Sequence, residues 1–335
     1  MEIPEVQKQI KKIADNNVSS ASTISREVCE CLDNFTGLVL EDARGLSAKS
    51  YFFELMDIGK QLVVAQRTMA PVFNAVNEII SLTHKELVKL DSELGPEEKR
   101  QLRYLCTYTQ SSARKYILSS QLAIEAIASS YELVLHDQPA VMTLSASSAV
   151  EALLMQAHNE GLTFRVIVPE SRPMNEGRTM AQRLVRAGID TTLIADGAMF
   201  QLLFECSAIL IGADRITPTG VMNKIGSFGL ALAAKELGLP FYCISEKTKF
   251  IPDFMGVHEL LVQHPTEELY PANEQNKSSE KLVVKNIYFD FTPIKYVTNF
   301  LTEDGLMTAD QVRKHIETME LVLVPELVGA VTAFR

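Results

Sequence analysis

The sequence has few cysteines, no long apolar run and no excess of positive charge, and each absence excludes a class of protein. Its five cysteines are odd in number and scattered, which argues against a disulfide framework or a zinc site. We therefore expect reduced, packed thiols and no metal. No apolar run approaches the roughly 20 residues of a membrane span, and residues 1–17 lack the apolar segment of a signal peptide. These features predict a cytoplasmic protein without a membrane partner.

The charge balance is acidic. Among 335 residues, 32 are basic and 42 are acidic, so the formal net charge is −10. A pervasive basic surface for nucleic acid is therefore not expected, although a local basic pocket for a small anion is compatible with this balance. At about 150 residues per domain, the length suggests two domains.

Two phosphate-binding motifs are also missing. No GxGxxG follows any strand-like run, and GxxxxGK[ST] is absent. Because these glycine-rich loops hold dinucleotides and nucleoside triphosphates, their absence weakens both interpretations, and we expect no cofactor.

Residues 1–130 have helical periodicity. Apolar side chains recur four residues apart, as at Ile24, Val28 and Leu32, and β-branched clusters are rare. Pro71 predicts a kink or a boundary, and Pro96 predicts the start of a helix that continues to about residue 130. The pattern indicates a helical domain.

Residues 131–335 alternate short apolar runs with helical segments, which predicts βαβ units and a Rossmann-like α/β domain with a parallel sheet. The expected strands are 140–144, 164–168, 191–194, 208–211 and 241–244. The expected helices are 149–160, 177–187, 197–204 and 225–237. Residues 217–222 and 249–285 are expected as loops, followed by a strand at 286–291 and a helix at 308–319.

Ligands of parallel sheets bind beyond the carboxyl ends of the strands, so polar residues after each strand are candidates for a binding site. Ser145, Ser147 and Ser148 follow the first strand, where they form either an anion cradle or an ordinary helix cap. Arg172 and Arg178 follow the second strand. Together they can clamp a phosphate, or Arg172 can pair with Glu170 or Glu176 on the surface.

The strongest candidate follows the strand 208–211. Asp214 can act as an acid or base, and Asn223 and Lys224 precede the helix 225–237, whose free amides add to the ammonium. This set suits a phosphorylated polyol. The alternative is that Asp214 caps its own loop while Lys224 is solvated. Arg67, in the helical half, is a surface residue by default and contributes only if the two domains close over the crevice.

Four segments resemble one known family: residues 211–250 (IGADRITPTGVMNKIGSFGLALAAKELGLPFYCISEKTKF), 166–196, 65–76 and 289–305. The family unites the regulatory subunits of translation initiation factor 2B with methylthioribose-1-phosphate isomerase and ribose-1,5-bisphosphate isomerase. The resemblance covers residues 10–320. It implies a helical N-terminal domain (1–130) and a Rossmann-like domain (131–335) that carries the ligand crevice and the dimer surface.

Two isomerase motifs are altered. The isomerases have a T-H-C-N-A-G loop whose cysteine acts with the aspartate of the GAD motif. Asp214 matches that aspartate, but Ser145 stands at the cysteine position and Leu144 at the histidine. An R-G-A-G phosphate motif falls on residues 19–22, or in a poorer register on 43–45. Since a hydroxyl is far less acidic than a thiol and no histidine lies nearby in sequence, serine needs an activating partner.

These differences favour a non-catalytic, factor-2B-like protein that binds a sugar phosphate or nucleotide monophosphate through Asp214, Arg67, Asn223 and Lys224. Its macromolecular partners would be copies of itself, as a homodimer or higher oligomer, or paralogous subunits. The alternative is an aldose-phosphate to ketose-phosphate isomerase with Asp214 as acid or base and Ser145 or water in place of the thiol. A third hypothesis is a structural dimer without a small ligand.

Overall fold

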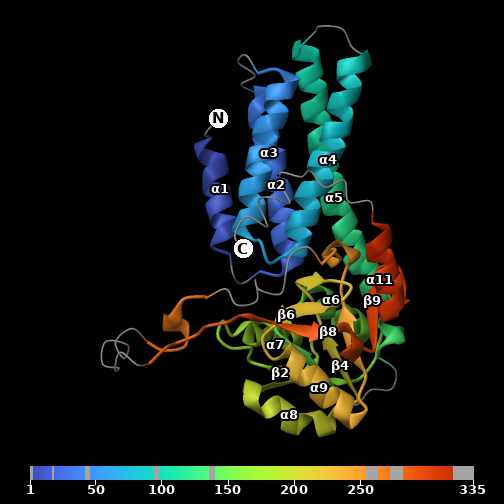
Figure 1. The fold of residues 1–335 in the computed structure, drawn as a ribbon. Coiled ribbons are helices and arrows are strands. Elements are labelled where there is room, and N and C mark those ends of the chain that lie inside the picture. The colour runs from blue at the N-terminus through green and yellow to red at the C-terminus, as the bar shows by residue number, and fades with distance from the viewer. Residues whose placement is uncertain are drawn as a thin grey trace. The chain divides into compact units, whose positions relative to one another are not determined.

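The computed structural model describes residues 3–16, 19–41, 46–93, 98–135, 140–253, 263–271 and 282–319. The chain divides into two compact units (Figure 1). The first takes in the described residues up to Leu122, and the second spans Ala123–Glu317. Within the described ranges, no helix is long and apolar enough to cross a membrane.

The first unit is helical, as predicted. Its helices are α1 (Pro4–Ala14), α2 (Ala21–Glu41), α3 (Ala48–Ala65), α4 (Ala70–Glu93) and α5 (Glu98–Ser129). Ile24, Val28 and Leu32 are fully buried, so the apolar stripe is the core face of α2. Pro71 lies in the first turn of α4 and therefore marks a boundary, whereas Pro96 lies outside the described residues.

The second unit contains a seven-stranded sheet in the order β10-β9-β7-β4-β1-β2-β3, which confirms the α/β class. All neighbouring strands are parallel except β10 and β9. The strands are β1 (Ala140–Leu144), β2 (Arg165–Pro169), β3 (Asp190–Ile194), β4 (Ala208–Ile211), β7 (Phe241–Ile244), β9 (Asn299–Thr302) and β10 (Gly305–Met307). The helices are α6 (Ser148–Asn159), α7 (Glu176–Arg186), α8 (Met199–Leu202), α9 (Ser227–Leu237) and α11 (Ala309–Thr318).

The sheet has a topological switch point at β1. The chain continues from β1 to β2 and β3 on one side, and then returns to β4 and β7 on the other. β1, β4 and β7 are buried along nearly their whole length, as expected for strands covered by helices on both faces. Loops after β1 and β4 therefore meet where an open α/β sheet places its ligands.

A second, three-stranded sheet corrects the prediction for residues 217–224. β5 (Arg215–Ile216) and β6 (Gly220–Lys224) form a hairpin, and β6 pairs antiparallel with β8 (Phe289–Pro293). The Thr217 N–H donates to the Gly220 carbonyl at 2.8 Å and closes the turn. Lys224 is thus the last residue of a strand, and the helix expected at 225–237 begins at Ser227.

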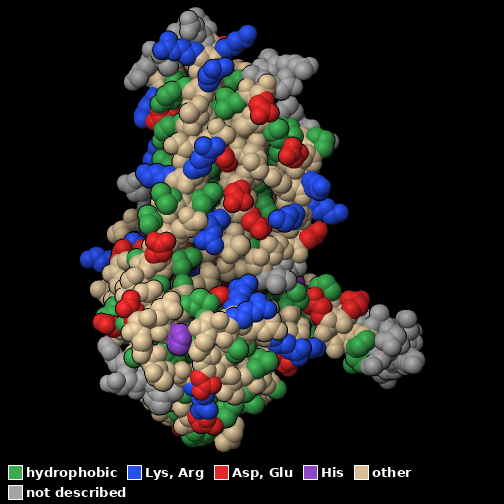
Figure 2. Space-filling model, turned by 180° about the vertical axis from the view of Figure 1, so that it is seen from behind, with side chains coloured by type: hydrophobic (Ala, Val, Ile, Leu, Met, Phe, Trp, Pro, Cys, Tyr) green, Lys and Arg blue, Asp and Glu red, His purple; other side chains and the backbone are tan. Residues whose placement is uncertain are grey.

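The surface agrees with the charge balance. On the face seen in Figure 2, basic and acidic side chains are interspersed among polar and apolar ones. Several ion pairs bridge neighbouring elements, for example Arg165 with Glu205 at 2.6 Å and Arg183 with Glu151 at 3.0 Å.

Candidate active site

Three loops at the carboxyl edge of the large sheet carry the candidate chemistry. Ser145 directly follows β1, Asp214 follows β4, and Glu176 begins α7 after β2. Because β4, β1 and β2 are consecutive neighbours, these loops leave the sheet side by side at its switch point.

The backbone of these loops is strained. Among the described residues, three that are not glycine have a positive φ: Ser145 at 68°, Ser171 at 64° and Asn175 at 58°. The Ser145 N–H donates to Ser171 Oγ at 2.9 Å and so joins the loop after β1 to the loop after β2. Such conformations cost about 1–3 kcal/mol each and cluster at functional sites.

Ser145 has an acidic partner. Its hydroxyl donates to Glu176 Oε1 at 3.0 Å, and Lys224 Nζ lies 2.7 Å from the same oxygen. The Lys224 side chain is only 4% exposed, and its Nζ lies 5.0 Å from the centre of the Tyr288 ring. We name Ser145, Glu176 and Lys224 the Glu176 cluster.

Sequence reasoning missed this role of Glu176 and treated it only as a surface partner of Arg172. The available signal was its position, since an acidic residue at the start of a helix after a buried strand faces the same edge as Ser145.

Asp214 is partly buried, and charged side chains surround its carboxyl group. Burial raises the pKa of Asp214, whereas Lys249 and Lys224 oppose that rise. Glu176 raises the pKa further, so Asp214 interacts electrostatically with two members of the Glu176 cluster. The carboxyl group therefore keeps its proton to a higher pH than an ordinary aspartic acid and is suited to donate it.

The sequence analysis predicted that the backbone amides at the amino end of α9 are free to bind a ligand. The structure shows that they are not. Asp290, on β8, accepts hydrogen bonds from Gly226 N at 2.8 Å and Phe228 N at 3.2 Å. The carboxylate from a neighbouring strand already occupies these amides. Asn223 is also engaged, because its Nδ2 donates to Ser227 Oγ at 3.0 Å.

The hydrogen bonds of Asp290 to the amino end of α9 can be tested through the proton that Asp290 binds. Burial outweighs its two hydrogen bonds and raises its pKa from 3.8 to about 6. The folded protein therefore holds this proton more tightly than the unfolded chain does, and the free energy of unfolding falls as pH rises from 4 to 7. Relative to Asp290→Asn, wild-type protein should lose about 2.4 kcal/mol between pH 4 and 7, because the unfolded carboxyl group is already partly ionised at pH 4. Urea unfolding of both proteins at pH 4 and 7 measures this difference.

A matched control is Asp310→Asn, because the Asp310 side chain is 91% exposed. Its removal should change the free energy of unfolding by less than about 1 kcal/mol at either pH, because an exposed ion pair such as that of Asp310 with Arg313 contributes little. An equal pH dependence in both variants would contradict the proton assignment to Asp290.

The remaining predicted residues of the second unit lie in the same loops. Ser147 Oγ accepts a hydrogen bond from Val150 N at 3.4 Å and caps α6, which begins at Ser148. Arg178 pairs with Glu170 at 2.5 Å, whereas the sequence analysis considered Glu170 as a partner of Arg172. Arg172 donates from Nη2 to the Glu268 carbonyl at 3.0 Å. Phosphate binding by these residues stays a prediction.

Arg67 lies in the first unit, in the turn between α3 and α4, and is half-buried. The preceding Gln66 fixes this turn, because its Nε2 donates to the carbonyls of Ile13 at 2.7 Å and Asn16 at 3.1 Å. Its participation in the site stays a prediction. Residues 19–22 include the start of α2, whereas the second register, 43–45, lies outside the described residues.

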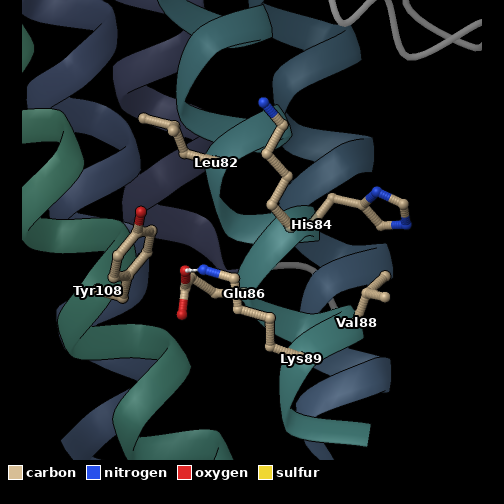
Figure 3. Close-up of a pocket in the computed structure, with 7 residues that line it drawn as sticks. Leu82, His84, Glu86, Val88, Lys89 and Tyr108 are labelled. Atoms are coloured by element: carbon tan, nitrogen blue, oxygen red, sulfur yellow. Dashed lines mark hydrogen bonds and ion pairs between the residues drawn. The ribbon is translucent and has the colours of Figure 1, made fainter. Parts of the chain in front are cut away.

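A separate depression of about 400 Å³ lies between α4 and α5 (Figure 3). Lys89 Nζ crosses it to Glu86 Oε1 at 2.5 Å, beside Tyr108. It contains none of the predicted site residues. Over the described ranges, no group of three or more His, Cys, Asp or Glu could hold a metal ion.

Comparison with known proteins assigns the family. The sequence profile of the initiation factor 2 subunit family matches residues 17–309. The chain belongs to this family. A ribose 1,5-bisphosphate isomerase of Archaeoglobus fulgidus is 31% identical over 90% of this chain and 89% of its own. The crystal structure of Pyrococcus horikoshii translation initiation factor eIF-2B has the same fold, with a TM-score of 0.73, 24% identity and coverage of 91% and 98% of the two chains.

These relatives overturn the expectation of a non-catalytic, factor-2B-like protein. Three more ribose 1,5-bisphosphate isomerases are 28% or 29% identical over 90–92% of this chain. By contrast, a putative eIF-2B subunit 2-like protein of Pyrococcus horikoshii is 28% identical over 76% of this chain and 80% of its own. The expectation was wrong because changes in two short motifs were given more weight than similarity along the whole chain.

Proposed function

We propose that this protein is an aldose-phosphate to ketose-phosphate isomerase that acts on ribose 1,5-bisphosphate or a close analogue. The observation that carries the proposal is Asp214, which stands at the switch point with a raised pKa and interacts with the buried ammonium of Lys224. The similarity to ribose 1,5-bisphosphate isomerases over 90–92% of the chain supports it.

The chemistry needs few protein groups. Converting a ribose 1-phosphate into its ketose opens the C1–O4 bond, moves the hydrogen on C2 to C1, and turns the C2 hydroxyl into a carbonyl. One protein group must give a proton to O4, which becomes a hydroxyl. Protonated Asp214 suits this role, because burial raises its pKa and so keeps the proton to a higher pH than in an ordinary aspartic acid.

Phosphate recognition falls to the cationic and polar residues of the same loops. Arg172 and Arg178 are exposed, and each can exchange its present partner for the stronger forked interaction with a phosphate. Ser147, Ser148, Asn223 and Lys224 complete the proposed binding set of the second unit. We propose that the protein works as a homodimer or higher oligomer formed through the second unit.

The test is a product assay. Purified protein is incubated with ribose 1,5-bisphosphate, with methylthioribose 1-phosphate, and with ribose 5-phosphate as a control that lacks the C1 phosphate. We expect ketose product from the first substrate, less from the second and none from the control. Absence of ketose from both 1-phosphates would contradict the proposed function.

A further inference from the structure

The proposed isomerisation needs a second proton-handling group. When the C2 hydroxyl becomes a carbonyl, its proton must leave O2 at the same time as O4 gains one from Asp214. The inference below rests on the proposed function and concerns the group that takes this proton. The isomerases that this chain resembles have a cysteine at the Ser145 position, but a serine hydroxyl needs a basic partner to do the same work.

The cysteine near Asp214 is unsuited to replace the missing thiol. Cys243, on β7, is fully buried, and its Sγ faces the Gly212 carbonyl at 4.0 Å. Burial raises the pKa of Cys243 to about 12, so a thiolate hardly forms near neutral pH. A different group must therefore accept the proton.

Ser145 and Glu176 have the geometry of a hydroxyl base and the carboxylate that orients it. Ser145 supplies the hydroxyl, and Glu176 supplies the carboxylate. The Ser145 hydroxyl points its proton at Glu176 Oε1, 3.0 Å away. Lys224 Nζ, at 2.7 Å, fixes the same oxygen. The second oxygen, Oε2, is buried and accepts no hydrogen bond from any described residue. One carboxylate oxygen thus holds the serine while the other still has acceptor capacity.

The backbone argues against a role in packing alone. Ser145 adopts a left-handed conformation, with φ at 68°, that a serine rarely takes. Ser171, itself at φ 64°, accepts the Ser145 N–H and stabilises this conformation. Because strain of this kind is retained where surrounding contacts enforce it, the loops fix the direction of the Ser145 side chain.

We propose that Ser145 and Glu176 act as a proton relay that replaces the thiol, with Ser145 as the catalytic residue and Glu176 and Lys224 as positioning residues. Ser145 Oγ takes the proton from O2 while its own proton moves to Glu176 Oε1. The electron pair left on O2 forms the C2=O bond, and the C2 hydrogen moves with its pair to C1. The C1–O4 bond breaks, and O4 takes the proton of Asp214. A proton then passes from Glu176 to Asp214, directly or through water, and restores both groups.

Four variants test the relay in the full-length protein: Ser145→Ala, Glu176→Gln, the double variant of the two, and Ser145→Cys. Each single loss should lower kcat by about 10²-fold, the lower end for acid–base groups. The double variant should be no slower than either single variant, because the two residues act as one unit. Glu205→Gln, an exposed acid near the opposite edge of the sheet, is the matched control and should keep full activity.

Two readouts separate a relay from a purely structural contact. The loss in Glu176→Gln should fall on kcat with KM nearly unchanged, because Glu176 acts during the reaction rather than in substrate binding. Ser145→Cys should retain activity, and Glu176→Gln should cost less in that background, because a thiol ionises with less help. Thermal melting of every variant controls for folding.

The outcomes separate this inference from the function on which it rests. Wild-type protein that makes no ketose contradicts the proposed function. If the wild type is active and Ser145→Ala or Glu176→Gln is fully active as well, the relay is contradicted but the proposed function is not. Multiplicative losses in the double variant also contradict it. If Glu176→Gln fails to fold, Ser145→Ala and Ser145→Cys still decide, since both leave the ion pair of Glu176 with Lys224 intact.

Discussion

Replacing Asp214 with asparagine is expected to lower kcat on ribose 1,5-bisphosphate by about 10²- to 10⁴-fold, the usual contribution of a positioned acid. Asparagine has nearly the same shape but no proton of suitable acidity. Burial raises the pKa of Asp214, and the proposed mechanism uses its protonated form. The wild-type kcat should therefore fall as pH increases through that raised pKa. The residual kcat of Asp214→Asn should not show this decrease.

Ketose formation measured from pH 5 to 9 on both proteins tests this expectation. Asp190→Asn, an exposed aspartate at the amino end of β3, is the control and should behave as wild type. KM should change little in Asp214→Asn, since the proton is needed during the reaction rather than for binding. An unchanged kcat would remove Asp214 from the mechanism.

The second large effect is expected at Gly177, the second residue of α7. A Cβ atom there would lie 1.9 Å from the Pro169 carbonyl oxygen and 2.9 Å from Ser171 Oγ. The carbonyl belongs to the end of β2 and cannot turn aside as a flexible side chain could. Gly177→Ala should therefore lower the free energy of unfolding by about 1–3 kcal/mol, as overpacking does. It should also lower kcat, because the neighbouring Glu176 must move.

The magnitude of the kinetic effect follows from geometry, since a displacement of about 1 Å in a reacting constellation costs about 10²-fold. Urea unfolding and the ketose assay measure the two losses. Gly197→Ala is the matched control, because a Cβ at Gly197 meets nothing within 4 Å. That variant should stay within about 0.5 kcal/mol of wild type. Equal values of kcat and of the free energy of unfolding in the two variants would mean that the loop after β2 can move to accommodate the added methyl group.

The large sheet could be predicted because its buried strands leave a local signal. β1 and β4 are short apolar runs followed by helical periodicity, and the predicted ranges agree with Ala140–Leu144 and Ala208–Ile211. The small sheet left no such signal. β5 has only two residues, and β6 pairs with β8 across more than 60 residues of chain. Pairing at that separation cannot be inferred from the periodicity of a short segment.

The candidate site shows the same division. Asp214 and Ser145 could be chosen because each follows a predicted strand, and Lys224 because it precedes the predicted helix 225–237. The partner of Ser145 could not, because Glu176 lies 31 residues further along the chain and the two meet only through the parallel pairing of β1 and β2. A search for a histidine nearby in sequence therefore missed the acid that the fold supplies.

The attachment of the segment around Lys224 has a consequence for the entropy of binding. Lys224 pairs with Phe289 in the small sheet, the Ile225 N–H donates to the Tyr288 carbonyl at 2.7 Å, and the Gly226 N–H donates to Asp290. The backbone on both sides is thus fixed before any substrate arrives, and the ion pair with Glu176 fixes the side chain. A free lysine side chain carries about 2 kcal/mol of rotamer entropy. Here that cost is met when the chain folds, so it does not reduce the affinity for substrate.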